Sequence, residues 1–184
     1  MTKKLLTIFF LFFFNSLNAE LTEKIILNLK DTENLTFDFK QQIEDKVENG
    51  SCIIKYPKKI YCSYKSLNNK VMVSNGKSLV IKNDNINQYY LYPLNKTPLE
   101  LILNKDYLIK KIKNQKSRVI DERYLNFTDN NNNFKINIFF DKKTLHLTGW
   151  QTEDLYQNLV ITFITNVETN QKISNNIFQL PETR

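Results

Sequence analysis

The sequence predicts a mainly β fold (α+β in class), in which a single curved antiparallel sheet forms an open, incomplete β-barrel covered by short lid helices. About nine or more short segments alternate apolar and polar residues, which is the pattern of half-buried strands. Asn, Gly, Pro and Asp residues separate these segments as turns. Helical periodicity is clear only in Leu21–Lys30 and Thr97–Leu103. A sheet of that many strands tends to curl, so these two helices are the elements available to cover its open face.

The first part of the chain predicts one helix and one strand. Leu21–Lys30 places apolar residues at four-residue spacing, which predicts an amphipathic helix of about three turns. Leu35–Lys40 alternates strictly, so Phe37 and Phe39 are expected on its buried face. Asn49-Gly50 then predicts a turn.

The segment Ser51–Tyr64 predicts a hairpin whose turn contains Pro57. With the loop centred on that proline, Cys52 faces Cys62 across the two strands, and a direct cross-strand pair lies close to disulfide range. Two buried, unpaired thiols are the alternative interpretation. The compartment decides between them, because a disulfide persists only where the surroundings are oxidising.

The middle of the chain predicts a second hairpin and a short helix. Lys70–Ser74 is expected to be a strand, and Asn75-Gly76 is a strong signal for a two-residue turn. A strand over Asn87–Tyr92 follows. Thr97 is expected to cap the helix Thr97–Leu103, with Pro98 as its first residue.

The rest of the chain predicts strands with one ambiguous stretch. Lys105–Ser117 is compatible with a basic helix or a strand. The strands are expected over Arg118–Thr128, Phe134–Phe140, Leu145–Thr152 and Asn158–Asn166, with turns at Asp129–Asn133 and Asp141–Lys143.

The N-terminus is typical of a secretory signal peptide. Lys3-Lys4 precedes the apolar run Leu5–Phe14, which is shorter than the ~20 residues of a membrane span. Cleavage is expected after Ala19, which divides the chain into a signal peptide, 1–19, and one exported domain, 20–184. The residue after the cut is not cysteine, so the mature chain is expected to lack a lipid anchor, to be soluble and to reside in the periplasm.

Composition excludes several classes of function. Loss of the signal peptide removes two of 26 basic residues against 19 acids, so the net charge falls from +7 to +5. The basic residues are scattered without a nucleic-acid-binding motif, so no nucleic acid is expected as a partner. The single histidine, His146, stands in an expected strand without a nucleophile motif. The chain is therefore not expected to be an enzyme or to hold a metal or cofactor.

Several segments together resemble the LolA family of periplasmic carriers that move lipoproteins to the outer membrane. Lys55-Tyr56-Pro57 resembles the family's Lys-Arg-Pro hairpin, and Val73–Leu79 resembles its Val-Ser-Asp-Gly-Lys-Thr-Leu segment. The other matching segments are Leu35–Gln41, Thr97–Ile102, Phe163–Val167 and Ile177–Pro181. In order and spacing they cover nearly all of 20–181.

The resemblance implies a monomeric carrier with a hydrophobic cavity for acyl chains. Its expected partners are acylated lipoproteins, an inner-membrane lipoprotein-releasing ABC transporter and an outer-membrane lipoprotein acceptor. The residues expected to line the cavity are Phe37, Phe39, Ile54, Tyr56, Ile60, Tyr64, Leu99 and Ile102. Tyr56 stands where the family has an arginine linked to holding the lid shut, so the mechanism of lid closure differs or uses other groups.

Two other functions are the alternatives to a carrier. A sensor of the same fold would bind lipid or lipoprotein fragments and regulate a membrane partner. A hydrolase would need a nucleophile with a base, which the sequence does not offer.

Overall fold

The computed structural model describes residues 19–65, 70–131, 134–153 and 157–182. All of the expected signal peptide except Ala19 lies outside the described residues. A helix covers residues 19–31 at the start of the described chain. The other α-helices are α2 (Leu99–Leu103) and α3 (Lys105–Asn114), and the 3₁₀ turns are η1 (Asp84–Ile86), η2 (Leu94–Lys96) and η3 (Asn175–Phe178).

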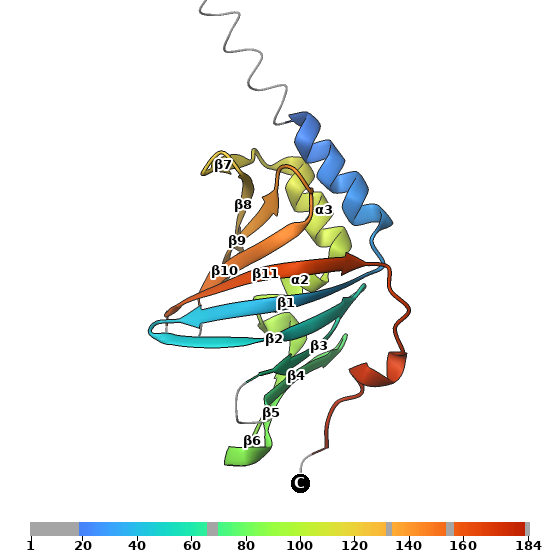
Figure 1. The fold of residues 1–184 in the computed structure, drawn as a ribbon, viewed down its shortest axis with the longest axis vertical. Coiled ribbons are helices and arrows are strands. Elements are labelled where there is room, and N and C mark those ends of the chain that lie inside the picture. Colours follow the sequence, from blue (N-terminus) through green and yellow to red (C-terminus); the bar gives the residue numbers. More distant parts are fainter. Residues whose placement is uncertain (1–18, 66–69, 132–133, 154–156, 183–184) are drawn as a thin grey trace, which may run out of the picture.

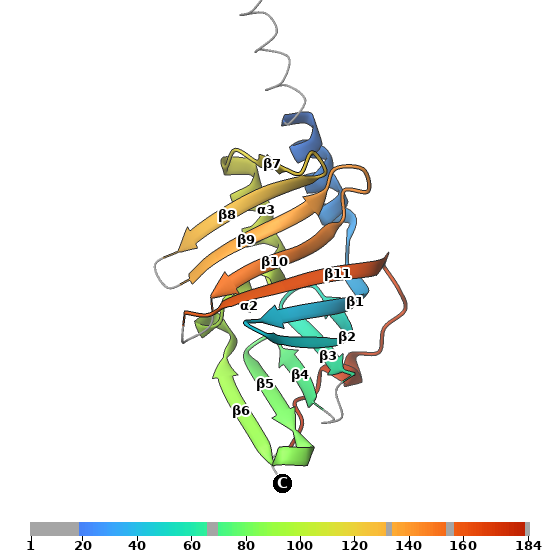
Figure 2. The same cartoon turned by 60° about the vertical axis from the view of Figure 1, so that its left-hand side comes forward.

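A single antiparallel sheet organises the molecule, which confirms the predicted fold class. Its eleven strands follow the order β6-β5-β4-β3-β2-β1-β11-β10-β9-β8-β7, so only β1 and β11 are neighbours across a long sequence separation. The strands are β1 (Asn34–Ile43), β2 (Lys46–Lys55), β3 (Lys59–Tyr64), β4 (Lys70–Asn75), β5 (Ser78–Asn83), β6 (Gln88–Pro93), β7 (Arg118–Ile120), β8 (Tyr124–Asn131), β9 (Phe134–Asp141), β10 (Leu147–Glu153) and β11 (Leu159–Thr169). The end strands β6 and β7 do not pair with each other, so the barrel is incomplete. Figure 2 shows how the strand direction turns from β8 to β6, which curves the sheet.

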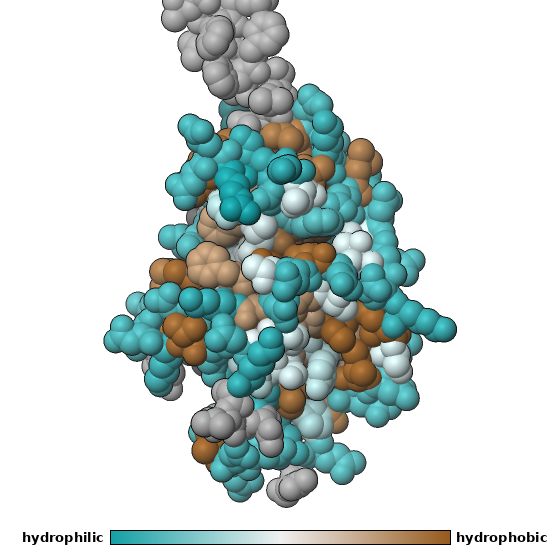
Figure 3. Space-filling view, viewed as in Figure 1, coloured by the Kyte–Doolittle hydropathy of each residue, from teal (hydrophilic) through white to brown (hydrophobic). Residues whose placement is uncertain are grey.

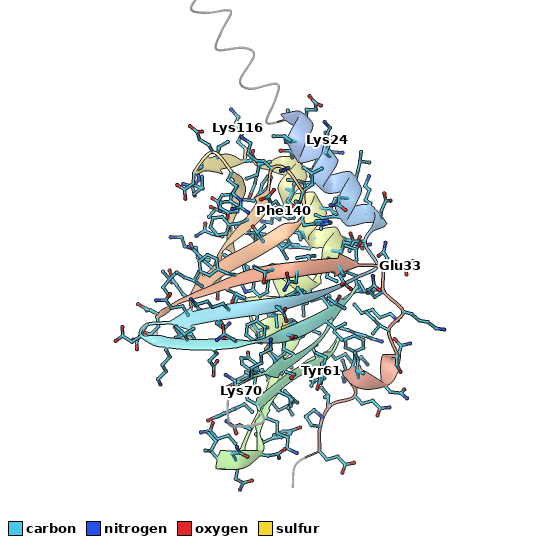
Figure 4. All side chains as sticks on the ribbon, viewed as in Figure 1. Lys24, Glu33, Tyr61, Lys70, Lys116 and Phe140 are labelled. Atoms are coloured by element: carbon cyan, nitrogen blue, oxygen red, sulfur yellow. A yellow bond between two sulfur atoms is a disulfide. The ribbon has the colours of Figure 1, made fainter. Side chains whose placement is uncertain are left out.

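The concave face of the sheet packs against the helices (Figure 1). One apolar cluster joins the helix 19–31 through Ile25 and Leu29, α2 through Ile102 and α3 through Ile112 to alternate residues of nearly every long strand. Phe140 of β9, labelled in Figure 4, belongs to this cluster and is fully buried. The predicted role of the first helix as a cover on the sheet is therefore confirmed.

The β2–β3 hairpin has the predicted register. Cys52 pairs with Cys62 and Ile54 pairs with Ile60, with Tyr56, Pro57 and Lys58 left in the turn. A disulfide joins the two cysteines, whose Cα atoms are 4.1 Å apart. The alternative of two free thiols is wrong for this structure.

The prediction of a turn at Asn49-Gly50 is wrong, because both residues lie inside β2. The chain turns instead at Glu44 and Asp45, between β1 and β2. A Cβ atom at Gly50 would come within 2.6 Å of the Phe39 ring and 2.2 Å of the Ser63 carbonyl oxygen. This glycine therefore allows close packing on the concave face. Glycine inside a strand often marks such a close approach.

Two details of the middle segment also differ from expectation. The β4–β5 loop is Gly76-Lys77, one residue later than predicted, and Gly76 has φ +99°. The Asn75 side-chain oxygen accepts hydrogen bonds from the backbone N–H groups of Lys77 and Ser78 at 3.0 Å. Asn75 therefore stabilises the turn from the last position of β4. Thr97 does not cap α2: its hydroxyl donates to the Leu94 carbonyl at 2.8 Å, and the helix begins after Pro98.

The ambiguous stretch after α2 is helical, since α3 covers Lys105–Asn114. The single strand predicted over Arg118–Thr128 is instead the β7–β8 hairpin, with a turn over residues 121–123. Asp129 belongs to β8 and not to a turn. It accepts hydrogen bonds at 2.8 Å from the Lys111 ammonium and the Tyr107 hydroxyl, which fix α3 to the sheet.

The C-terminal segment crosses the outer face of the sheet. Phe178 of η3 is only 2% exposed, and Val73 and Val80 on outward positions of β4 and β5 are also buried. Lys55 donates to the Asn175 side chain at 2.9 Å, and the Tyr89 hydroxyl donates to the Pro181 carbonyl at 3.2 Å. This segment therefore covers strands that would otherwise expose apolar side chains to water, as Figure 4 shows beside Tyr61.

Replacing Asp141 with Asn is expected to lower the free energy of unfolding by about 1–3 kcal/mol at neutral pH. Burial favours the neutral carboxyl, but the Thr144 N–H, the Arg123 side chain and the Lys143 N–H outweigh it, so the pKa of Asp141 is lowered. A lowered pKa contributes stability above the unfolded-state pKa of about 3.9, and this contribution is lost as the pH falls through the folded-state value. Urea unfolding should therefore show a smaller difference in the free energy of unfolding between wild type and variant at pH 3 than at pH 7. Asp121→Asn, on the exposed β7–β8 turn, is the control and should change neither curve.

Candidate functional site

The residues predicted to line the cavity come together in one place. Six of the eight are buried in the apolar cluster between sheet and helices, and the other two, Tyr56 and Leu99, pack against it. The buried six are Phe37, Phe39, Ile54, Ile60, Tyr64 and Ile102. Their side chains belong to one cluster with those of the helices, and within it the Phe39 and Tyr64 rings are 5.0 Å apart and edge-on. Their role in binding an acyl chain stays a prediction.

The turn of the β2–β3 hairpin holds the helices in place. The Lys58 N–H donates to the Leu103 carbonyl at the end of α2 at 2.9 Å. The Lys58 ammonium forms a 2.7 Å ion pair with Glu100 on the same helix. Lys105, at the start of α3, donates to the carbonyls of Lys30 and Thr32 at 3.1 and 2.9 Å, so it joins α3 to the end of the helix 19–31.

Tyr56 lies where these contacts meet. Its N–H donates to the Glu33 carbonyl at 2.9 Å, and the Lys105 ammonium lies 5.6 Å from the centre of its ring. Its hydroxyl oxygen is buried and has no hydrogen-bond partner among the described residues. Burial raises the pKa of Tyr56, so the phenol is neutral at physiological pH.

Beyond the helices, the concave face opens into a recess of about 440 Å³. The strand register places Ile81 and Tyr90 in one row with Met72 and Cys62, which assigns the recess to the concave face. We call this space the concave recess; its lining residues are Lys46, Glu48, Lys70, Ile81, Asn83, Ile86, Gln88, Tyr90 and Tyr92. Its volume falls within the range of about 300–1,000 Å³ that is common for small-molecule sites.

One wall of the concave recess is charged and the other is aromatic. Lys70 forms a 2.7 Å ion pair with Glu48, and its ammonium lies 4.2 Å from the centre of the buried Tyr64 ring. The Tyr90 and Tyr92 rings stack with their centres 6.3 Å apart. Figure 4 shows Lys70 at the end of the small strands away from the C-terminal segment. The concave recess therefore offers aromatic side chains to an apolar chain, and its charged groups are already paired with each other on the opposite wall.

A second groove, of about 460 Å³, lies on the outer face of the sheet. Gly149 has no side chain, and it stands between Phe139 and Phe163 in one row across β9, β10 and β11. Phe163 is 54% exposed. Figure 3 looks onto this face and shows apolar side chains in patches between hydrophilic ones.

Sequence reasoning missed the residues of the concave recess. The alternation of Tyr90 and Tyr92 within the predicted strand Asn87–Tyr92 was a usable signal, because it puts both rings on one face. The pairing of that face with Ile81 depends on the β5–β6 register, which no local pattern fixes.

Three further observations bear on the class of site. Within the described ranges, no cluster of three or more His, Cys, Asp or Glu side chains is placed to hold a metal ion. No helix in the part of the chain that the structure describes is long and apolar enough to cross a membrane. His146 lies between β9 and β10, where its Nδ1 is 3.5 Å from the Asn28 amide nitrogen of the first helix.

The chain is similar to several known proteins. The chain is 28% identical over 166 residues to an outer-membrane lipoprotein carrier protein of Idiomarina loihiensis, covering 83% of this chain and 80% of that protein. The crystal structure of an uncharacterized conserved protein from Thermus thermophilus shares the fold at a TM-score of 0.52, with 8% identity over 89% of this chain and 94% of that one. A LolA superfamily protein from Nitrosomonas europaea gives a TM-score of 0.46 at 9% identity, covering 89% and 97% of the two chains. The family model described as "Outer membrane lipoprotein carrier protein LolA" matches residues 30–181. The chain therefore belongs to the LolA family.

Proposed function

We propose that this protein is a soluble periplasmic carrier that shields lipoprotein acyl chains and shuttles lipoproteins from the inner to the outer membrane. Membership of a family of carrier proteins supports binding without catalysis. The inner-membrane ABC transporter and the outer-membrane acceptor are the partners that such a route requires. Export would depend on the expected signal peptide, with 20–184 as the mature carrier domain.

The observation that carries the proposal is the continuity of one apolar face. The cluster beneath the helices includes Leu79, and Met72 and Tyr92 pack against it. The register places the concave recess directly beside these residues. An acyl chain that enters the recess would therefore meet apolar side chains further in once the helices move aside. Each CH₂ group removed from water contributes about 0.8 kcal/mol. Summed over several carbons, this favours transfer of the acyl chain from water to the apolar face.

Apolar side chains of the cluster hold the helices on the sheet, and partly exposed polar contacts at the β2–β3 turn add to this packing. The Lys58 and Glu100 side chains are 35% and 24% exposed. An exposed ion pair stabilises by at most about 1 kcal/mol, so its loss does not commit the protein to unfolding. A carrier needs this balance because it must both cover its cargo and release it.

Replacing Tyr90 with Asp is expected to reduce binding of acylated lipoproteins about tenfold or more, because it places a carboxylate against the apolar tail. Leu91→Asp is the matched control. The two residues are neighbours on β6, with Tyr90 43% and Leu91 57% exposed, but Leu91 points to the outer face. Purification from envelope extract, followed by detection of co-purified lipoproteins, measures the difference. Equal retention by the two variants would contradict the position of the site.

Depletion of the protein in cells tests the route. Mislocalised lipoproteins are the outcome expected of a carrier. An altered stress response with lipoproteins correctly placed would instead indicate a sensor and contradict the proposal.

A further inference from the structure

We infer that the Tyr56 hydroxyl donates a hydrogen bond to the carbonyl oxygen of a bound acyl chain, so that the protein recognises acyl groups and not hydrocarbon alone. This inference rests on the carrier function proposed above and identifies the hydroxyl group that recognises the ligand. It starts from the buried hydroxyl that has no partner among the described residues.

The position of Tyr56 is fixed, so its hydroxyl is presented in one direction. The residue follows β2 directly and its N–H is bonded to the Glu33 carbonyl. The Lys105 ammonium stands over its ring and is itself held by the Lys30 and Thr32 carbonyls. The side chain is therefore ordered before any ligand arrives, which lowers the entropy lost on binding.

The surroundings of Tyr56 select the kind of acceptor. The ring packs against the apolar cluster that includes Ile54, Ile60 and Ile102. A phenol in such a place is neutral, and it donates one hydrogen bond. A phosphate or carboxylate would need a cationic partner in the same space, whereas the ammonium over the ring, that of Lys105, already donates to two backbone carbonyls. A neutral carbonyl on an otherwise apolar chain fits this place, because it accepts the one hydrogen bond and the rest of the chain packs against the apolar cluster.

The energetic argument concerns the difference between the empty and the loaded protein. A buried donor without a partner destabilises the empty, closed form. An acyl carbonyl that reaches the hydroxyl removes this penalty only in the loaded form. The hydroxyl therefore favours binding of an acyl chain over an alkyl chain of the same length.

The test uses two lipids that differ at one group: a palmitoyl glycerol ester and the corresponding hexadecyl glycerol ether, which lacks the carbonyl. Each displaces a fluorescent apolar dye from the protein. Wild type is expected to bind the ester about three- to tenfold more tightly than the ether. Tyr56→Phe should bring that ratio to about one while leaving the affinity for the ether unchanged. Tyr61→Phe, the same change on the outer face of β3, should keep the wild-type ratio.

The unfolding midpoint of the empty protein is the second measurement. Tyr56→Phe should leave the midpoint unchanged or raise it, because it removes a polar atom that has no partner. A lower midpoint would show that the hydroxyl is already bonded and would overturn the inference. An equal affinity of wild type for ester and ether would also overturn it while leaving the carrier proposal intact. Failure of wild type to bind either lipid would overturn both.

Discussion

Gly50→Ala is expected to lower the free energy of unfolding by about 3 kcal/mol, the upper end of the range for an overpacked core. The new methyl group would lie 2.2 Å from the Ser63 carbonyl oxygen and 2.6 Å from the Phe39 ring. The backbone of β3 cannot yield without weakening its pairing with β2, and the Phe39 ring cannot yield without losing its edge-on contact with Tyr64.

The matched control is Gly76→Ala, at the β4–β5 turn. There the added atom has open space, with its nearest neighbour 3.8 Å away, but φ is +99°. The substitution should therefore cost about 1 kcal/mol from backbone strain alone. Urea denaturation of the two variants separates the effects, and equal losses would contradict the packing argument at Gly50.

Loss of the Cys52–Cys62 disulfide is the second large effect that we expect. The bond closes a loop with a sequence separation of 10 residues, and a cross-link of that size stabilises by about 3 kcal/mol through the unfolded state. The double variant Cys52→Ala/Cys62→Ala should therefore unfold at a lower urea concentration than the oxidised wild type.

Reduced wild type is the control, because it lacks the bond but keeps both sulfur atoms in the core. Its urea unfolding midpoint should lie between those of the other two proteins, since the alanine variant also loses buried volume. Mass spectrometry of the oxidised protein should show a mass lower by two hydrogens than that of the dithiol. Free thiols at both positions, or equal stability of oxidised and reduced protein, would contradict the prediction.

Sequence patterns were sufficient where a local signal and the buried face agreed. The proline turn at Pro57 was enough to predict the register that opposes Cys52 and Cys62, and the alternation through Phe37 and Phe39 predicted the buried face of β1. They failed where a residue has two possible uses. Gly50 is as typical of a turn as of a tight approach between strands, and only the position of Phe39 decides.

The candidate site was predicted in part for the same reason. Apolar residues of alternating strands could be assigned to one interior, and the structure places them together. Which part of that interior is open depends on how far the helices reach across the sheet. The concave recess exists because α2 and α3 lie over the other strands and leave β4–β6 uncovered at Lys70, Ile81 and Tyr90. This is a property of tertiary packing, which no short pattern in the sequence records.

The turn at Tyr56–Lys58 has a mechanical consequence. It is bonded to the end of α2 through Leu103 and to the chain after the first helix through Glu33. The two strands that lead to it are joined by a covalent bond between their sulfur atoms. The β2–β3 hairpin is therefore rigid. We expect the helices to rotate about its turn during loading and release, while the sheet keeps its shape.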